Sequence, residues 1–315
     1  MNVPKIEPLP VGVVRPLWSV MIPTYNCARY LRQTLASVLA QDPGPEQMQI
    51  EVVDDCSTQD NPETVVREAG MGRVIFHRNL TNQGVTQNFN TCIRRSRGQL
   101  VHILHGDDYV LPGFYQRIQQ VAETHPGTAL LATRSFYVDT ENQVTGTTEQ
   151  LDELATPAHG TESFHYKTPI QTPSVVMRRN FYEQHGGFDL TLVHTADCEM
   201  WARAVGLEGG CVSQDVLACY RTFAANDSGR LARTAGNLHD IGRLNQIFAD
   251  RYPAFDSKKA ARRVWDLAYK QIQHFNNTGD LEAALANLHF WRTHAPRSLR
   301  FRKFIKSSLK KTFKL

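Results

Sequence analysis

Strand-like and helix-like segments alternate over the first 125 residues, and this alternation restricts the fold more than any other feature. Four runs rich in apolar and β-branched residues have strand character, and three segments between or after them repeat apolar residues at helical spacing. The strand-like runs are 17–26, 48–55, 72–79 and 99–108, and the helical segments are 28–41, 84–98 and 112–126. Such an order predicts an α/β fold, with a mostly parallel sheet covered by helices on both faces.

Beyond this region the pattern changes twice. Strand-like pieces continue to about residue 188, a helix is expected over 196–205 and a strand over 210–223. From residue 227 onward the periodicity is helical. We therefore expect a flexible lead over 1–16, an α/β domain over 17–226 and a helical region over 227–315 that ends in a basic tail. No run approaches the roughly 18 apolar residues of a membrane span.

The net charge of +4 is concentrated at the end of the chain. Segment 296–315 holds eight Lys or Arg residues and no acid, so the remainder is about −4 and no nucleic-acid partner is expected. Within 299–315, apolar residues recur every four positions among these cations. This pattern is typical of an amphipathic helix on an anionic membrane. A terminal helix packed on its own domain, with a solvated basic face, remains the alternative.

Polar residues follow the ends of all four early strand-like runs. The segments at these ends are "PTYN" (23–26), "DDCSTQD" (54–60), "HRNLTNQG" (77–84) and "HGDD" (105–108). In parallel α/β sheets, ligands bind beyond the carboxyl ends of the strands. The adjacent Asp107 and Asp108 could cap a helix, but two like charges at a strand tip favour a neutralising cation. Mg²⁺ or Mn²⁺ shared with a diphosphate fits this pattern.

Other phosphate sites are disfavoured. The chain has no G-x-x-x-x-G-K-[ST] loop and no G-x-G-x-x-G after its first strand-like run. His102 and His105 are three apart on a predicted strand, hence on opposite faces, so they make a poor metal pair. We expect His102 to lie in the core or to support the residues of a site from behind.

Seven motifs together resemble the family 2 glycosyltransferases of GT-A fold, through about residue 228. In order they are "SVMIPTYN", "IEVVDDCSTQD", "NQGVTQNFN", "GQLVHILHGDDYVLPG", "PSVVMRRNFYEQHGGFD", "ADCEMWARAVGLEGG" and "YRTFAANDS". The resemblance implies a Rossmann-like GT-A domain. It also implies inverting transfer of a sugar from a nucleoside-diphosphate sugar, with UDP the favoured carrier, to a hydroxyl acceptor.

The resemblance also assigns roles to residues. Nucleotide binding falls to Pro23, Thr24, Tyr25, Asn26, Asp55, Asn82, Gly84 and Asp107, metal binding to Asp108 with Asp107, and general-base catalysis to Asp197. Asp55 is expected to accept a hydrogen bond from a ring N–H of the base. Glu199 is the alternative base, Trp201 is expected in the core, and Thr172, Pro173 and Ser174 are expected near the site.

Three positions depart from the family pattern. His105 stands where an acid is common, Ala196 where Glu is common, and Phe223 where a His often follows the "YR" pair. If that His assists metal binding in relatives, the site here has one ligand fewer.

The resemblance implies partners as well. The acceptor would be a glycan or a lipid-linked molecule, as in bacterial surface polysaccharide or glycolipid synthesis. The enzyme would be cytoplasmic, or peripheral at the inner face of the plasma membrane through residues 299–315. Two other functions remain open: a catalytically silent module that binds nucleotide sugars or glycans, and a sugar nucleotidyltransferase.

Overall fold

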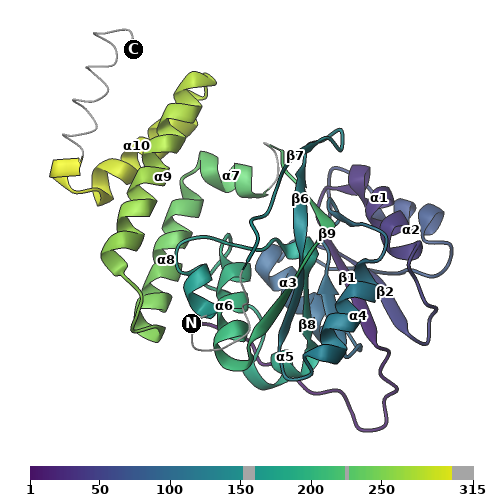
Figure 1. Cartoon of the computed structure of the whole chain (residues 1–315). Helices are drawn as coiled ribbons and strands as arrows, with labels where there is room; N and C mark the ends of the chain where they lie inside the picture. The colour runs from purple at the N-terminus through teal and green to yellow at the C-terminus, as the bar shows by residue number, and fades with distance from the viewer. Residues whose placement is uncertain (152–159, 224–226, 300–315) are drawn as a thin grey trace. The chain divides into compact units, whose positions relative to one another are not determined.

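A computed structural model describes residues 1–151, 160–223 and 227–299 (Figure 1). The chain divides into two compact units, Met1–Phe223 and Ala224–Leu315. The first unit contains the sheet and the second contains only helices in its described part. Each unit is described by itself below.

Four parallel strands form one half of the sheet. They are β1 (Trp18–Thr24), β2 (Met48–Asp54), β3 (Ile75–Arg78) and β4 (Leu100–Ile103), in the spatial order β3-β2-β1-β4. The register places Trp18 beside both Met48 and Leu100, and Thr24 beside Asp54. The carboxyl ends of these strands therefore share one edge, as the sequence pattern predicts.

The other half of the sheet mixes directions. It contains β5 (Tyr109–Val110), β6 (Leu130–Val138), β7 (Val144–Thr147), β8 (Val175–Arg178) and β9 (Gly210–Arg221). Strand β8 lies antiparallel between β4 and β6, while β9 runs parallel to β6 and also pairs with β5. The predicted α/β class is confirmed, and the expected parallel pairing describes the β3-β2-β1-β4 half.

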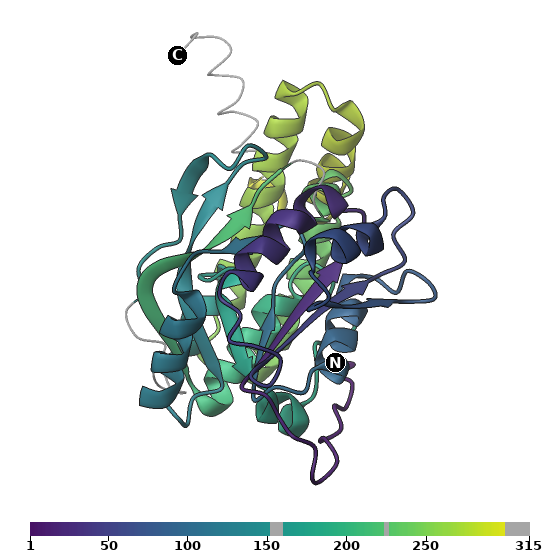
Figure 2. The ribbon, with the colours of Figure 1, turned by 90° about the vertical axis from the view of Figure 1, so that its right-hand side faces the viewer.

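Helices cover both faces of the sheet (Figures 1 and 2). Their bounds are α1 (Ala28–Leu39), α2 (Pro62–Ala69), α3 (Val85–Arg95), α4 (Phe114–Thr124), α5 (Arg179–His185) and α6 (Ala196–Glu208). Trp18, Val20 and Ile22 point from β1 into one core with α1 and α4. Because side chains alternate along a strand, Ser19 faces the opposite side, where its hydroxyl accepts the Arg97 and Gly98 N–H groups after α3.

The expected flexible lead over 1–16 makes specific contacts with the first unit. The Asn2 N–H donates to Asp189 (2.9 Å), and the Pro4 carbonyl accepts from the Gly187 N–H (2.9 Å). Ile6 is fully buried. Burying an aliphatic side chain contributes roughly 1.5–3 kcal/mol, so this segment is anchored at several points.

The helical unit has its own core. It comprises α7 (Asp227–Arg233), α8 (Gly236–Arg251), α9 (Ser257–Asn277) and α10 (Leu281–His294). Leu238, Val264 and Phe290 are buried together between α8, α9 and α10. Asp256 and Asp280 cap the amino ends of α9 and α10 with their carboxylates. No helix within the described residues has the length and apolar character needed to cross a membrane. The amphipathic tail predicted over 299–315 lies outside the described residues, apart from Leu299.

Candidate active site

The carboxyl ends of β2 and β3 are joined by a buried acid. Asp54 is fully buried and forms an ion pair with Arg78 at 2.5 Å. It also accepts hydrogen bonds from the backbone N–H and the hydroxyl of Ser57. Asp54 therefore holds the sheet edge together, and the neighbouring Asp55 is left to face the next loop.

Asp55 organises the loop after β3. Its Oδ1 accepts from the Asn79 amide (2.9 Å) and the Gln83 N–H (3.0 Å), and its Oδ2 accepts from the Gly84 N–H (2.9 Å). Asn82 also accepts from the Gly84 N–H, at 3.1 Å. Gly84 has φ of +85°, a conformation that glycine adopts without steric cost. Asp55, Asn82 and Gly84, which the sequence assigns to the nucleotide, are thus brought together.

The segment 23–26 continues β1 across the same edge. Its first two residues are buried, whereas Tyr25 is 39% exposed. Asn26 has φ of +52°, and its side-chain oxygen accepts from the N–H groups of Thr58 and Gln59. These hydrogen bonds fix the segment to the loop after β2 and leave the Tyr25 ring accessible.

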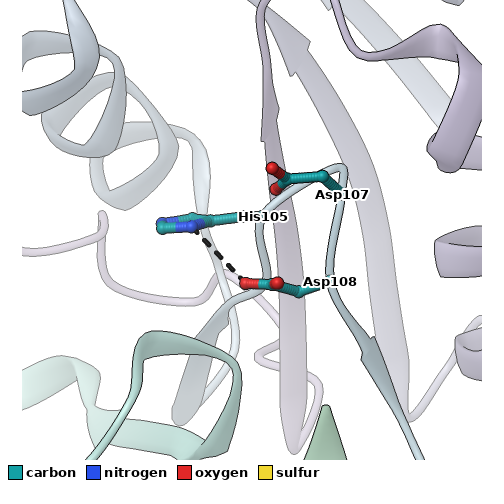
Figure 3. Close-up of side chains that lie close together, drawn as sticks. All are labelled: His105, Asp107 and Asp108. Carbon is teal, nitrogen blue, oxygen red and sulfur yellow. Dashed lines mark ion pairs between the residues drawn. The ribbon is translucent and has the colours of Figure 1, made fainter. Parts of the chain in front are cut away.

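The turn between β4 and β5 gathers three potential metal ligands. One ligand atom from each of His105, Asp107 and Asp108 lies within 4.8 Å of the other two. Asp108 is 1% exposed, and its Oδ1 accepts from the Arg221 N–H at 2.8 Å. Among the residues that the structure describes, its Oδ2 has no hydrogen-bond partner, and His105 Nδ1 lies 3.6 Å from it (Figure 3). A buried carboxylate oxygen without a donor is costly unless a cation meets it.

Electrostatics reinforce this view of the turn. Burial raises the pKa of Asp108 well above its ordinary value, and the charge of Asp107 raises it further. The Arg221 N–H and guanidinium act in the opposite direction. A divalent cation would remove the penalty of holding two carboxylates together, so the cluster suits one. The sequence analysis does not predict His105 as a member of this cluster. The available signal was its position next to Gly106 and close to the two acids in the sequence.

Arg221 supports this turn from β9. Its side chain is almost fully buried and donates to the carbonyls of Asp107 and Asp139. Its guanidinium lies 4.5 Å from the centre of the Tyr30 ring. Phe223, the departure from the family pattern, packs on the same ring at 5.5 Å. At this position an apolar contact therefore stands where the resemblance leads us to expect an imidazole.

Asp197 lies in the first turn of α6. Its Oδ1 accepts from the Cys198 N–H (2.6 Å), and its Oδ2 accepts from the Thr172 hydroxyl (3.5 Å). Thr172 belongs to a short 3₁₀ helix, η2 (Thr172–Ser174). Burial raises the pKa of Asp197, while the hydrogen bonds and the His194 charge oppose that rise. A half-buried carboxylate with a raised pKa is a suitable proton acceptor.

Glu199, the alternative base, has a different environment. It is fully buried and paired with Arg203 at 3.1 Å. Arg203 also donates to the carbonyls of His185 and Gly187, so the pair ties α6 to the loop after α5. Trp201 is 2% exposed, in the core as expected. Of the two acids in the first turn of α6, Asp197 is therefore the accessible one.

Buried contacts link these parts. His102 Nε2 lies 3.0 Å from the Pro173 carbonyl and Nδ1 lies 3.2 Å from the Tyr115 hydroxyl, so β4 holds η2 in place. On the other side, the His105 ring stacks on Phe89 of α3 at 5.2 Å. The helix α3 begins directly after Gly84. The His105 turn is thus connected to the Asp55 loop through α3 and to Asp197 through η2.

A match to a protein-family model shows the family to which the chain belongs. The model described as "Glycosyl transferase family 2" matches residues 19–186, more than half of the chain. The chain belongs to glycosyltransferase family 2. The predicted family and enzyme class are thereby confirmed, and the nucleotidyltransferase alternative falls away. The matched region contains the strand ends, the Asp55 loop and the His105 turn.

Relatives with similar sequences include proteins without a described activity. An uncharacterised protein of Mycobacterium tuberculosis is 28% identical over 267 residues, which cover 81% of this glycosyltransferase and 83% of the relative. An uncharacterised glycosyltransferase of a Nostoc species is 36% identical over 110 residues, about a third of each chain. The poly(ribitol-phosphate) β-N-acetylglucosaminyltransferase TarS of Staphylococcus aureus is 30% identical over 94 residues, only 16% of its length.

Solved structures confirm the fold. The TarS fragment 1–349 in complex with UDP-GlcNAc superposes with a TM-score of 0.55 over 88% of this chain and 91% of that one, at 16% identity. A mannosyltransferase of Pyrobaculum calidifontis, solved with GDP-Man and Mn²⁺, gives a TM-score of 0.53 over 94% of this chain and 81% of that one, at 17% identity. At such identities the likeness is one of fold, and the glycosyltransferase has the predicted GT-A architecture.

Proposed function

We propose that this glycosyltransferase moves a sugar from a nucleoside-diphosphate sugar to a hydroxyl acceptor with inversion at the anomeric carbon. The observation that carries the proposal is the connection, through His102 and η2, between the acidic turn after β4 and the accessible Asp197. An acid pair suited to a cation, connected in this way to a carboxylate suited to proton transfer, matches the two ends of a displacement reaction. UDP is the favoured carrier, and the UDP-GlcNAc complex of a protein with this fold supports it.

The nucleotide side of the site is proposed at the edge formed by β1 and β2. Pro23, Thr24, Tyr25 and Asn26 would line it together with Asp55, Asn82 and Gly84, and Asp107 would lie near the ribose. Each Asp55 oxygen already accepts two hydrogen bonds, the capacity of a carboxylate oxygen. We therefore assign Asp55 to shaping the loop over the base, and a direct bond to a ring N–H would require one loop N–H to be released.

Mg²⁺ or Mn²⁺ is proposed at the turn after β4. The fit rests on the Asp108 oxygen that has no donor within the described ranges and on the closeness of Asp107. When bound, the ion would neutralise the diphosphate as it departs. The protein holds Asp108 for this purpose through Arg221, and Thr34 donates to the carbonyls of Gly106 and Asp108.

Asp197 is proposed as the general base. It would take the proton of the attacking hydroxyl, and Thr172 would keep Oδ2 oriented. A positioned general base contributes about 10²–10⁴ in rate, or roughly 3–5 kcal/mol of barrier. The acceptor is proposed to be a glycan or a lipid-linked molecule of a bacterial cell surface, in line with the polyol-phosphate polymer named for TarS. A peripheral membrane contact through 299–315 remains part of this proposal.

Substituting Asp197→Asn tests the proposal. We expect transfer to fall by about 10²–10⁴ while the dissociation constant for the donor stays unchanged, because only the proton acceptor is removed. Asp250→Asn, on the exposed surface of α8, is the control and should keep full activity. Near wild-type transfer by the Asp197 variant would reject the base. Donor binding without any turnover by the wild-type chain would instead support the silent binding module.

A further inference from the structure

The turn after β4 presents a nitrogen atom as well as carboxylates. His105 Nδ1 lies 3.6 Å from Asp108 Oδ2, which is too long for a hydrogen bond and short enough for both atoms to bind one ion. Bonds from zinc to nitrogen or oxygen ligands are about 2.0–2.2 Å long. Two ligand atoms bound to one ion at a tetrahedral angle are therefore about 3.5 Å apart, close to the separation of these two atoms. The imidazole thus faces the Asp108 oxygen for which the described part of the chain supplies no donor.

The packing around His105 fixes its ring. The imidazole stacks on Phe89 with an interplanar angle of 17°. The neighbouring Gly106 N–H donates to the Pro23 carbonyl, and the Thr34 hydroxyl donates to the Gly106 carbonyl. A ring held on one face by an aromatic side chain, in a turn with fixed backbone, is oriented before any ion arrives.

The ligand chemistry then determines which ion is preferred. Mg²⁺ is bound through oxygen, whereas imidazole suits transition metals. We infer that His105 is a metal ligand, which gives this turn a mixed nitrogen and oxygen set with Asp107 and Asp108 and a preference for transition-metal dications over Mg²⁺. The inference deepens the proposed function, on which its biological meaning rests. It also assigns a role to the position where the sequence departs from the common acid.

The opposing explanation is an ion pair. A protonated His105 beside Asp108 would be stabilised by charge alone and would bind no metal. The two explanations differ in a direct spectroscopic signature, because only a ligating imidazole gives ¹⁴N modulation in the electron spin echo of bound Mn²⁺. They also differ in affinity, because only a ligand contributes to the binding constant.

The experiment uses the full-length chain with Mn²⁺, Co²⁺ and Mg²⁺ and without nucleotide. We expect ¹⁴N modulation in the wild type and in the control His125→Ala, whose side chain is exposed. His105→Ala should lose the modulation and bind Co²⁺ at least ~10-fold more weakly, since even supporting residues of a metal site are worth about that much. His105→Asp should lower the ratio of Co²⁺ to Mg²⁺ affinity by a similar factor.

The outcomes separate this inference from the proposed function. Absence of ¹⁴N modulation in Mn²⁺-loaded wild type overturns the inference, and this measurement needs no variant to fold. Unchanged Co²⁺ affinity in a folded His105→Ala protein overturns it too, even if sugar transfer proceeds. If donor turnover is absent but the modulation is present and depends on His105, the inference stands and the proposed function fails.

Discussion

His102 positions a neighbouring loop as a buried, uncharged ring. Its side chain is fully buried between Tyr115 and the Pro173 carbonyl, and burial lowers its pKa to about 3. The neutral ring can donate from Nε2 to Pro173 and accept from Tyr115 at Nδ1. The residue expected in the core thus also connects the sheet to η2.

His102 makes stability depend on pH with a definite sign. Its pKa is lower in the folded state than its ordinary 6.5, so the unfolded chain takes up the proton first and stability falls as pH drops from about 6.5 towards 3. Between pH 7 and pH 5 the loss attributable to this group is about 2 kcal/mol. Urea unfolding of wild type and His102→Gln at both pH values checks this. The stability difference between the two proteins should shrink by that amount, and a constant difference would contradict it.

The activity profile should report the environment of Asp197. Its carboxyl must be deprotonated to act as a base, and its pKa is raised, so kcat/KM should fall as pH drops through a value above the ordinary aspartate range. The Thr172 hydroxyl bond lowers that pKa, so Thr172→Val should move the acidic limb to higher pH. Thr172→Ser keeps the hydroxyl and is the matched control. Identical profiles for the Val and Ser variants would show that Thr172 does not act on the base.

At the residue scale, the sequence predicts which polar residues lie at the site better than it predicts the hydrogen bonds that these residues form. Asp55, Asn82 and Gly84 were expected at one site and lie together. The hydrogen bonds that occupy Asp55 come from the Asn79 side chain and from the backbone N–H groups of Gln83 and Gly84, which lie 24 to 29 residues away, and no residue pattern encodes them. From the sequence, His105 is only a departure from an expected acid. Its position near Asp108 depends on how the turn packs against α3, which the residue pattern does not encode.

Among the elements, the turn 105–108 depends on the absence of a side chain at Gly106. A Cβ there would lie 2.7 Å from Thr24 Cγ2 and 2.8 Å from Cys27 Sγ, so the turn packs directly on the end of β1. We expect Gly106→Ala to displace the ligands, weaken Mn²⁺ binding and destabilise the protein by about 1–3 kcal/mol, the usual cost of overpacking. Titration with Mn²⁺ and urea unfolding measure both effects.

A compensating pair of substitutions makes this prediction sharper. Thr24→Ser and Cys27→Ala remove the two atoms that the new Cβ would meet. Combined with Gly106→Ala, they should restore much of the Mn²⁺ affinity, because the backbone can return to its position. A Gly106→Ala protein that binds Mn²⁺ as the wild type does would show that the close packing is unimportant.

Element pairing shows where prediction from sequence stops. The four early strands and the helices α1, α3 and α4 followed from local periodicity, whereas the short α2 (Pro62–Ala69) was not predicted. Short right-handed crossovers make the parallel order of these strands the expected one. The antiparallel β8, inserted between β4 and β6, joins segments about 75 residues apart along the chain, as in the pairing of Leu100 with Arg178. Only two residues form β5, and its partner β9 comes over 100 residues later. Neither pairing leaves a local signal.

For the molecule as a whole, the two units have separate cores and the candidate site belongs to one of them. Every residue placed in the site lies within Met1–Phe223. The cores described for the helical unit draw only on residues of that unit. A large buried core with its own sheet is the usual basis of independent folding.

A chain that ends at Phe223 should therefore fold and keep its proposed metal site. We expect a single cooperative urea transition and Mn²⁺ affinity equal to that of the full chain, because all ligands and their supporting contacts are retained. Loss of Mn²⁺ binding in a folded fragment would show that the helical unit completes the site. If the fragment binds Mn²⁺ and donor but no longer transfers sugar, the helical unit is needed for the acceptor. The sheet unit would then be sufficient to bind both the metal and the donor.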